Sequence, residues 1–160
     1  MKIRVAILTV SDSAVAGTRA DVSGPALREH CVTAGWDVVE ALAVKDEVDS
    51  ISAAVSKWAD EGTADLILTT GGTGIAPRDV TPEATRSLVD REIPGIGELL
   101  RVKGLEQTKF SVLSRGLAGS RKQALIVNLP GSPSGAVFSV KAIEHLVAHT
   151  VNLLRGNTAH

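Results

Sequence analysis

Apolar residues along the chain gather in four short runs that are separated by longer stretches of mixed polarity. The runs are rich in β-branched side chains and occupy residues 5–10, 37–44, 65–70 and 124–129. Three of them are nearly continuous in apolar side chains, which is typical of strands whose two faces are both covered by helices. The pattern therefore predicts four strands of a mostly parallel sheet.

Between the strands, apolar side chains recur at helical spacing. Helices are expected after Ser23, after Asp46, after Thr81 and after Ser132, with a fifth from about residue 95 to residue 108. Thr81 and Ser132 each stand directly before a proline, so both fit the capping position that precedes a first helical turn. Strands and helices alternate without a linker or repeat, which predicts one α/β domain over residues 1–160, a three-layer αβα sandwich. The segment 109–122 leaves room for a short extra strand.

The charge of the chain is nearly balanced, with 17 basic and 18 acidic residues, and the basic residues are spread out. Recruitment of a nucleic acid by bulk positive charge is therefore excluded, and any bound anion must be held by local groups. Cys31 is the only cysteine, which excludes an internal disulfide and suits a reducing compartment. The chain shows neither a signal-peptide pattern nor an apolar stretch of membrane-spanning length, so we expect a cytoplasmic protein.

Polar residues and glycines follow each predicted strand. The four strand exits read "SDS", "KDE", "TGGTG" and "PGSPSG". In open parallel sheets, ligands bind outside the carboxyl ends of the strands, and these ends share one edge. The sequence therefore predicts a binding site at this edge of the sheet.

The third exit is the most informative, because Gly71, Gly72 and Gly74 lie within four residues. Glycine lets a ligand approach the backbone closely, and its N–H groups can bind an anion, with the hydroxyls of Thr70 and Thr73 beside them. The alternative is a tight turn that needs positive φ angles. Three glycines at one strand exit favour a binding loop, although neither a Walker A motif nor the dinucleotide pattern G-x-G-x-x-G is present.

Two carboxylates are expected at the same edge. Asp79 would repel an anion held by the glycine loop unless a divalent cation or a proton transfer makes use of it. Its alternative roles are a salt bridge with Arg78 or a helix cap, although Thr81 already occupies the capping position. Asp46 fits the N-cap of the helix that follows it as well as it fits catalysis. A Mg²⁺ ion shared by Asp46 and Asp79 could bridge phosphate oxygens.

Smaller signals come from the first strand exit and from residues 114–122. Ser11 and Asp12 are expected to be functional, because an acidic side chain at the end of a buried strand is unfavourable unless it has a role there. The residues Ser114, Arg115, Arg121 and Lys122 fit either anion ligands or a solvated basic face.

Taken together, several motifs make the chain resemble the molybdenum-cofactor biosynthesis family of molybdopterin-binding domains. The motifs are "TVSDS", "LTTGGTG", "RDVTPEAT", "REIPGIGELLR", "LSR" and "RKQALIVNLPGSP". Within this family (the Mog and MoaB groups) the chain is most similar to the Mog-type molybdopterin adenylyltransferases, from Val5 to about Leu154. The pairing of "TTGGTG" with "RDVTPEAT" is specific, whereas "PGSP" alone is weak.

The resemblance implies a homotrimer that transfers AMP from MgATP to the terminal phosphate of molybdopterin. The product would pass to a molybdate-insertion (MoeA-like) protein. On the family pattern, Asp46 and Asp79 match the carboxylates tied to adenylyl transfer and Mg²⁺, and Ser11 with Asp12 matches the first-strand loop. The pattern also implies contacts to the pterin and its phosphate from Thr70, Gly71, Gly72, Thr73, Gly74, Ser114, Pro130, Gly131 and Ser132.

Two alternatives remain open at this stage. A MoaB-like sister group keeps the fold and the glycine loop, and its members need not catalyse adenylylation. A non-catalytic trimeric carrier or scaffold for the cofactor would use the same edge. The presence of both Asp46 and Asp79 favours an enzyme, because a carrier of an anion gains nothing from two acids beside it.

Overall fold

The structure is a computed structural model that describes residues 1–159 of the chain. Its strands are β1 (Arg4–Val10), β2 (Asp37–Val44), β3 (Leu66–Thr70), β4 (Arg91–Glu92), β5 (Ala118–Arg121) and β6 (Ala124–Leu129). Its helices are α1 (Asp12–Ala16), α2 (Ser23–Thr33), α3 (Val48–Asp60), α4 (Thr81–Leu88), α5 (Pro94–Gly104), the 3₁₀ helix η1 (Lys109–Leu113) and α6 (Pro133–Leu154).

One sheet of six strands runs through the molecule in the order β2-β1-β3-β6-β5-β4. The first four of these strands are parallel, and their register places Val5 beside Leu66 and Leu66 beside Leu125. β5 and β4 extend the sheet in antiparallel fashion. The predicted mostly parallel sheet is confirmed.

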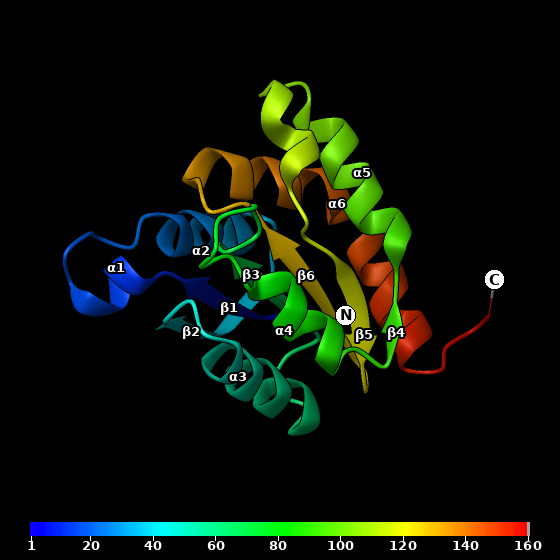
Figure 1. Cartoon of the computed structure of the whole chain (residues 1–160). Helices are drawn as coiled ribbons and strands as arrows, with labels where there is room; N and C mark the ends of the chain where they lie inside the picture. The colour runs from blue at the N-terminus through cyan, green and yellow to red at the C-terminus, as the bar shows by residue number, and fades with distance from the viewer. Residues whose placement is uncertain (160) are drawn as a thin grey trace.

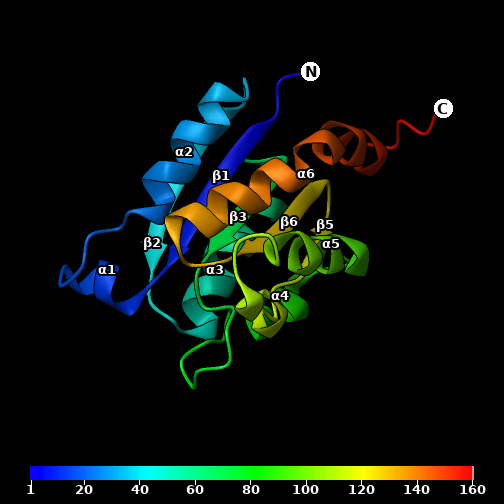
Figure 2. The same cartoon turned by 90° about the horizontal axis from the view of Figure 1, so that it is seen from above.

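Helices cover both faces of the sheet, as Figure 1 and Figure 2 show. Successive residues of a strand point to opposite faces, so Val5 and Ile7 of β1 lie in one apolar layer with residues of α2, α5 and α6. Ala6 and Leu8 lie in the other layer with residues of α3 and α4. These four side chains are at most 1% exposed. The αβα sandwich therefore has two apolar layers, and Cys31 lies in the first of them, as its place on the apolar stripe indicated.

Some local predictions were wrong or incomplete. Thr81 does not cap α4, because it is the first helical residue and its hydroxyl donates instead to the carbonyl of Gly71, at 2.9 Å. Ser132 does cap α6, where its Oγ accepts the N–H of Gly135. The extra strand within residues 109–122 is β5, and the short elements α1, β4 and η1 were not predicted.

The amino ends of β1 and β3 are joined to the C-terminal end of α6 by a buried carboxylate. Asp65 has a side chain that is 3% exposed and accepts hydrogen bonds from Arg4 and Arg155. Burial alone would raise the pKa of Asp65, but the hydrogen bonds from Arg4 and then Arg155 outweigh it and lower the pKa to about 2. The ionised form is therefore stabilised by folding.

We expect Asp65→Asn to lower the free energy of unfolding at pH 7 by about 2 kcal/mol, because the folded-state pKa lies below that of an unfolded aspartate. The contribution of Asp65 is complete above about pH 4 and is lost as the pH falls toward 2. Urea unfolding at several pH values measures both effects. The variant should lose less stability than the wild type between pH 4 and pH 2, whereas the exposed-site control Asp37→Asn should follow the wild type. Equal slopes for Asp65→Asn and the wild type would contradict this account.

Candidate active site

The loop after β3 is bound directly to the loop after β6. The N–H of Gly71 donates to the carbonyl of Leu129 at 3.2 Å, and the hydroxyl of Thr70 donates to the carbonyl of Pro130 at 2.6 Å. Gly131 approaches so closely that a Cβ added to it would lie 3.3 Å from the Cα of Gly71. The two strand exits therefore form one rigid floor, as the shared-edge prediction requires.

Two of the three loop glycines have left-handed backbones. Gly71 and Gly72 have φ angles of 103° and 67°. A Cβ on Gly71 would meet the carbonyl oxygen of Val10 at 2.4 Å, and one on Gly72 would meet the hydroxyl of Thr81 at 2.4 Å. The tight-turn interpretation therefore applies to both residues. Gly74 is needed for a different reason, because a Cβ there would lie 2.8 Å from Oδ2 of Asp79.

Two cavities open at this edge. The larger, of about 700 Å³, is lined among others by the predicted residues Thr73, Gly74, Ser114, Pro130 and Ser132. The smaller, of about 490 Å³, is lined among others by the predicted residues Ser11, Thr70, Gly71, Gly131 and Ser132. Ser132 borders both cavities, so two ligands bound in them would meet at the start of α6.

The two cavities differ in chemistry. Leu100, Phe110 and Leu113, from α5 and η1, give the larger cavity an apolar wall. The smaller cavity is rich in hydroxyls and includes Thr9 and Ser13. The apolar wall was not predicted, because residues 109–122 show no periodicity from which to place it.

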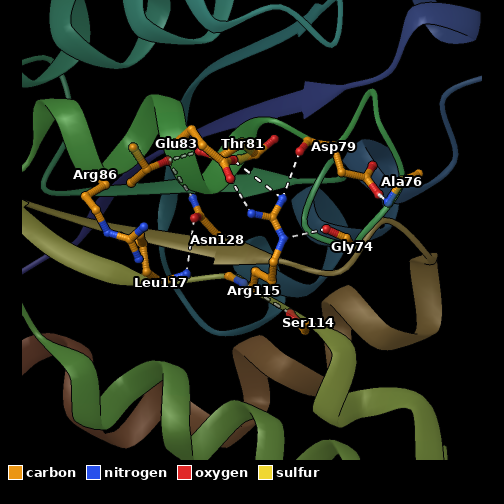
Figure 3. Close-up of polar contacts among 12 residues, drawn as sticks. Gly74, Ala76, Asp79, Thr81, Glu83, Arg86, Ser114, Arg115, Leu117 and Asn128 are labelled. Carbon is orange, nitrogen blue, oxygen red and sulfur yellow. Dashed lines mark hydrogen bonds and ion pairs between the residues drawn. The ribbon is translucent and has the colours of Figure 1, made fainter.

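Asn128 is a further residue of the site that was not predicted from the sequence. It lies at the border of the larger cavity and is 3% exposed. Its amide donates to the hydroxyls of Thr69 and Thr85, at 2.9 and 3.0 Å, and its Oδ1 accepts the N–H of Leu117. It thus joins β3, α4 and the start of β5 beneath the site (Figure 3). A single polar residue inside the apolar run "ALIVNL" was the available signal.

Asp46 and Asp79 flank the glycine loop rather than line either cavity. A Cβ on Gly72 would lie 3.3 Å from Oδ1 of Asp46, and one on Gly74 would lie next to Asp79. The predicted proximity of both acids to the loop is thus found. Asp46 is not the cap of α3, because Glu47 occupies that position and makes no side-chain capping bond.

Asp46 is instead locked to Asp12. The N–H of Asp12 donates to Oδ2 of Asp46 at 2.9 Å, and the N–H of Asp46 donates to Oδ1 of Asp12 at 3.0 Å. Burial raises the pKa of Asp46 above its usual range, and the Asp12 and Asp79 charges add to this, while the N–H of Asp12 and the charge of Arg78 oppose it. The N–H of Asp46, followed by Arg78, lowers the pKa of Asp12. Asp12 therefore remains ionised beside Asp46.

Arg78 does not pair with Asp79. Its guanidinium binds both oxygens of Asp12, at 2.8 to 3.0 Å, across 66 residues of sequence. Asp79 uses Oδ2 to accept the N–H of Ala76 at 2.9 Å, while its own N–H donates to the carbonyl of Ala76 (Figure 3). The segment 74–79 is therefore a closed turn that is tied to α1.

The candidate anion ligands of residues 114–122 separate into two groups. Ser114 borders the larger cavity, and Arg115 reaches the glycine loop. Arg121 binds Asp60 and the carbonyl of Leu88, at the opposite end of the sheet. The N–H of Lys122 donates to Asp90 at that same end. Neither Arg121 nor Lys122 can therefore serve as an anion ligand of this site.

Asp46 and Asp79 provide too few carboxylate oxygens to surround a hard cation such as Mg²⁺ without other ligands. Within residues 1–159, no three His, Cys, Asp or Glu side chains are grouped to hold a metal. Asp46 and Asp79 each use Oδ2 to accept a hydrogen bond from a backbone N–H, so Oδ1 of each remains available as a metal ligand. Mg²⁺ usually takes one or two protein carboxylates and completes its shell with water and substrate phosphates. Each acid therefore has one carboxylate oxygen available to a cation.

Comparison with known proteins identifies the family. Residues 6–149 match the family described as "Probable molybdopterin binding domain". The chain belongs to this family. The matched residues contain the motifs from which the resemblance was drawn, and they extend from within β1 to most of α6, including the residues of both cavities and the glycine loop.

Individual relatives agree with this family assignment. Over 157 residues the chain is 39% identical to a molybdopterin adenylyltransferase of Helicobacter pylori strain J99, a match that covers 97% of this chain and 89% of the relative. A crystal structure of the molybdopterin biosynthesis enzyme MoaB from Thermus thermophilus has a TM-score of 0.90 at 49% identity, covering 96% of this chain and 97% of the other. The chain is also 41% identical over 154 residues to the molybdenum cofactor synthesis protein cinnamon of Drosophila melanogaster, and it spans 26% of that protein's length.

No helix within residues 1–159 has the length and apolar character needed to cross a membrane.

Proposed function

We propose that this protein is a molybdopterin adenylyltransferase, which transfers AMP from ATP to the terminal phosphate of molybdopterin and releases pyrophosphate. The observation that carries this proposal is the pair of cavities that meet at Ser132 beside a glycine loop flanked by Asp46 and Asp79. A carrier of one anion needs neither a second cavity nor two acids. The 39% identity to the Helicobacter pylori adenylyltransferase over nearly the whole chain supports the same activity.

In the proposed reaction, an oxygen of the pterin's terminal phosphate attacks the α-phosphorus of ATP. A new P–O–P linkage forms, the bond between the α- and β-phosphates breaks, and pyrophosphate leaves with the electron pair. The larger cavity has an apolar wall that suits a flat ring system, and the hydroxyls of the smaller cavity suit phosphate oxygens. The start of α6, between the two cavities, favours negative charge. The protein's role is to hold the two phosphates in line.

The backbone of the glycine loop and the hydroxyls around it would bind the phosphates. We propose as substrate contacts those predicted residues that border one of the cavities. They are Ser11, Thr70, Gly71, Thr73, Gly74, Ser114, Pro130, Gly131 and Ser132. Gly72 and Asp12 border neither of the two. We assign Gly72 to the turn of the loop, and Asp12 to holding Asp46 through their reciprocal hydrogen bonds.

Asp46 and Asp79 are proposed to hold Mg²⁺ through their remaining Oδ1 atoms. When bound, the ion would neutralise charge that develops on the phosphate oxygens. We expect a chelator such as EDTA to abolish formation of adenylylated molybdopterin, and added Mg²⁺ to restore it. Product analysis by chromatography measures this. Full activity in excess EDTA would show that the two acids act without a metal.

A second candidate follows from the structural comparison. The MoaB enzyme of Thermus thermophilus shares 49% of its sequence with this chain, so a MoaB-like role as a pterin-binding protein or carrier is the competing proposal. The two are separated by one experiment, in which purified protein is mixed with MgATP and molybdopterin. Adenylylated product supports the transferase, and pterin binding without product supports the carrier.

The wider setting of the activity is also a proposal. We propose that residues 1–160 form a single functional domain that assembles as a homotrimer in the cytoplasm and delivers its product to a MoeA-like molybdate-insertion protein. Exposed apolar side chains on α5 and η1, such as Val102, Phe110 and Val112, support an interface between subunits. The single cysteine, Cys31, suits a reducing compartment.

A further inference from the structure

Arg115 links the larger cavity to the segment that carries Asp79. It follows Ser114, which borders the cavity, and its backbone N–H donates to the carbonyl of Thr73 at 2.8 Å. Its side chain is 37% exposed and extends toward the glycine loop rather than into the solvent. The residue therefore contacts the loop through both its backbone and its side chain.

The guanidinium of Arg115 binds both ends of the segment 74–79. Nε donates to the carbonyl of Gly74 and Nη2 donates to the carbonyl of Asp79, each at 2.8 Å. Nη1 forms an ion pair with Glu83 in the first turn of α4. Figure 3 shows the guanidinium directed at these three residues. One side chain thus closes the turn and fastens it to the helix that follows.

These contacts indicate what Arg115 does for the site. The positive charge of Arg115 is balanced by Glu83, and each of its three guanidinium nitrogens donates a hydrogen bond to the protein. Few of its N–H groups therefore remain to bind a substrate phosphate. Asp79 is held at its backbone carbonyl by Arg115, and its carboxylate is fixed within the same turn by Ala76. A shift of that carbonyl must therefore move the carboxylate.

We propose that Arg115 is a positioning residue, which sets the place of the Asp79 carboxylate relative to the glycine loop. This inference rests on the proposed adenylyl transfer, in which Asp79 acts at the reacting phosphates. The fork of an arginine can bind two carbonyls and a carboxylate at once, whereas the single ammonium of lysine cannot reproduce that geometry. Shape, rather than charge, is what the position requires.

A double-mutant cycle tests the proposal. We expect Arg115→Ala to lower kcat for AMP transfer by about tenfold to a hundredfold, with KM for ATP changed by less than about threefold, because a misplaced catalytic group slows the reaction. Arg115→Lys should be nearly as slow as Arg115→Ala. In the Asp79→Asn background, Arg115→Ala should cost less than about threefold further, because both residues act as one unit. Full additivity of the two changes, or recovery of kcat in Arg115→Lys, would overturn the proposal.

The control is Arg121→Ala, since Arg121 makes the same kind of contacts, to one carboxylate and one carbonyl, at the other end of the sheet. It should lose stability and keep kcat when assayed below its melting temperature. Hydrogen exchange gives a readout that does not need activity: amides of residues 74–79 should exchange about tenfold faster in Arg115→Ala and unchanged in Arg121→Ala. Unchanged exchange in Arg115→Ala would overturn the positioning role, whereas wild-type protein that makes no product would overturn the proposed function alone.

Discussion

Asp79→Asn is expected to lower AMP transfer by about a hundredfold or more while leaving the fold intact. The substitution removes the negative charge of the Asp79 carboxylate, which we propose holds Mg²⁺ beside the reacting phosphates. It preserves the shape of the side chain, and the amide oxygen of asparagine can still accept the N–H of Ala76 that Asp79 accepts at 2.9 Å. The turn at 74–79 should therefore persist in the variant.

The measurement combines single-turnover product formation with pterin binding and urea unfolding. Binding of molybdopterin should stay within about threefold of the wild type, because the charge acts mainly in the transition state. A matched control is Asp90→Asn, since Asp90 also accepts one backbone N–H, from Lys122 at 2.8 Å, but lies away from the site. Asp90→Asn should turn over normally. Normal turnover together with a loss of stability in Asp79→Asn would assign Asp79 a structural role only.

The second large effect concerns the stability of the glycine loop. We expect Gly71→Ala to lower the free energy of unfolding by about 3 kcal/mol or more, because two costs add. The φ angle of 103° is one that residues with a Cβ rarely adopt, and the new Cβ would lie 2.4 Å from the carbonyl oxygen of Val10. The contact is with the backbone of β1, which pairs with a strand on each side and therefore has little freedom to move.

Two alanine controls separate these costs. Gly35 has a φ of 82° with nothing within 4 Å of a new Cβ, so Gly35→Ala carries only the backbone cost, about 1 kcal/mol. Gly95 lies in α5 with open space around it and no positive φ, so Gly95→Ala should change stability by less than about 0.5 kcal/mol. Denaturant unfolding should rank the three variants in this order. A Gly71→Ala variant no less stable than Gly35→Ala would mean that the loop gives way around the side chain.

Most of the fold could be predicted from the sequence, because the core elements are long enough to show their period. The four strands and five helices came from apolar runs and helical spacing, and only the ends differ by a few residues. Three short elements, α1, β4 and η1, were not predicted, and η1 lies in residues 109–122, which showed no period. α1 has five residues, too few to show a repeat, and β4 is an exposed pair, Arg91–Glu92, that exists only by pairing with β5.

The place of the site was also predictable, because strand exits of a parallel sheet share one edge. Its internal contacts were not, because they join residues far apart in sequence and depend on how the elements pack. A salt bridge between Arg78 and Asp79 was one alternative from the sequence, but Arg78 binds Asp12, 66 residues away. Arg115 binds the carbonyl of Gly74, 41 residues away. Thr81 looked like a helix cap, but the glycine loop lies against it and takes its hydroxyl.

The proposed function is tested most directly by one reaction. Purified wild-type protein is mixed with molybdopterin and MgATP labelled at the α-phosphate, and the pterin product and pyrophosphate are both quantified. We expect label to appear on the pterin and one pyrophosphate to be released per labelled pterin, with neither formed when molybdopterin is omitted. Saturated pterin binding without transfer of label would contradict it and would identify the protein as a carrier.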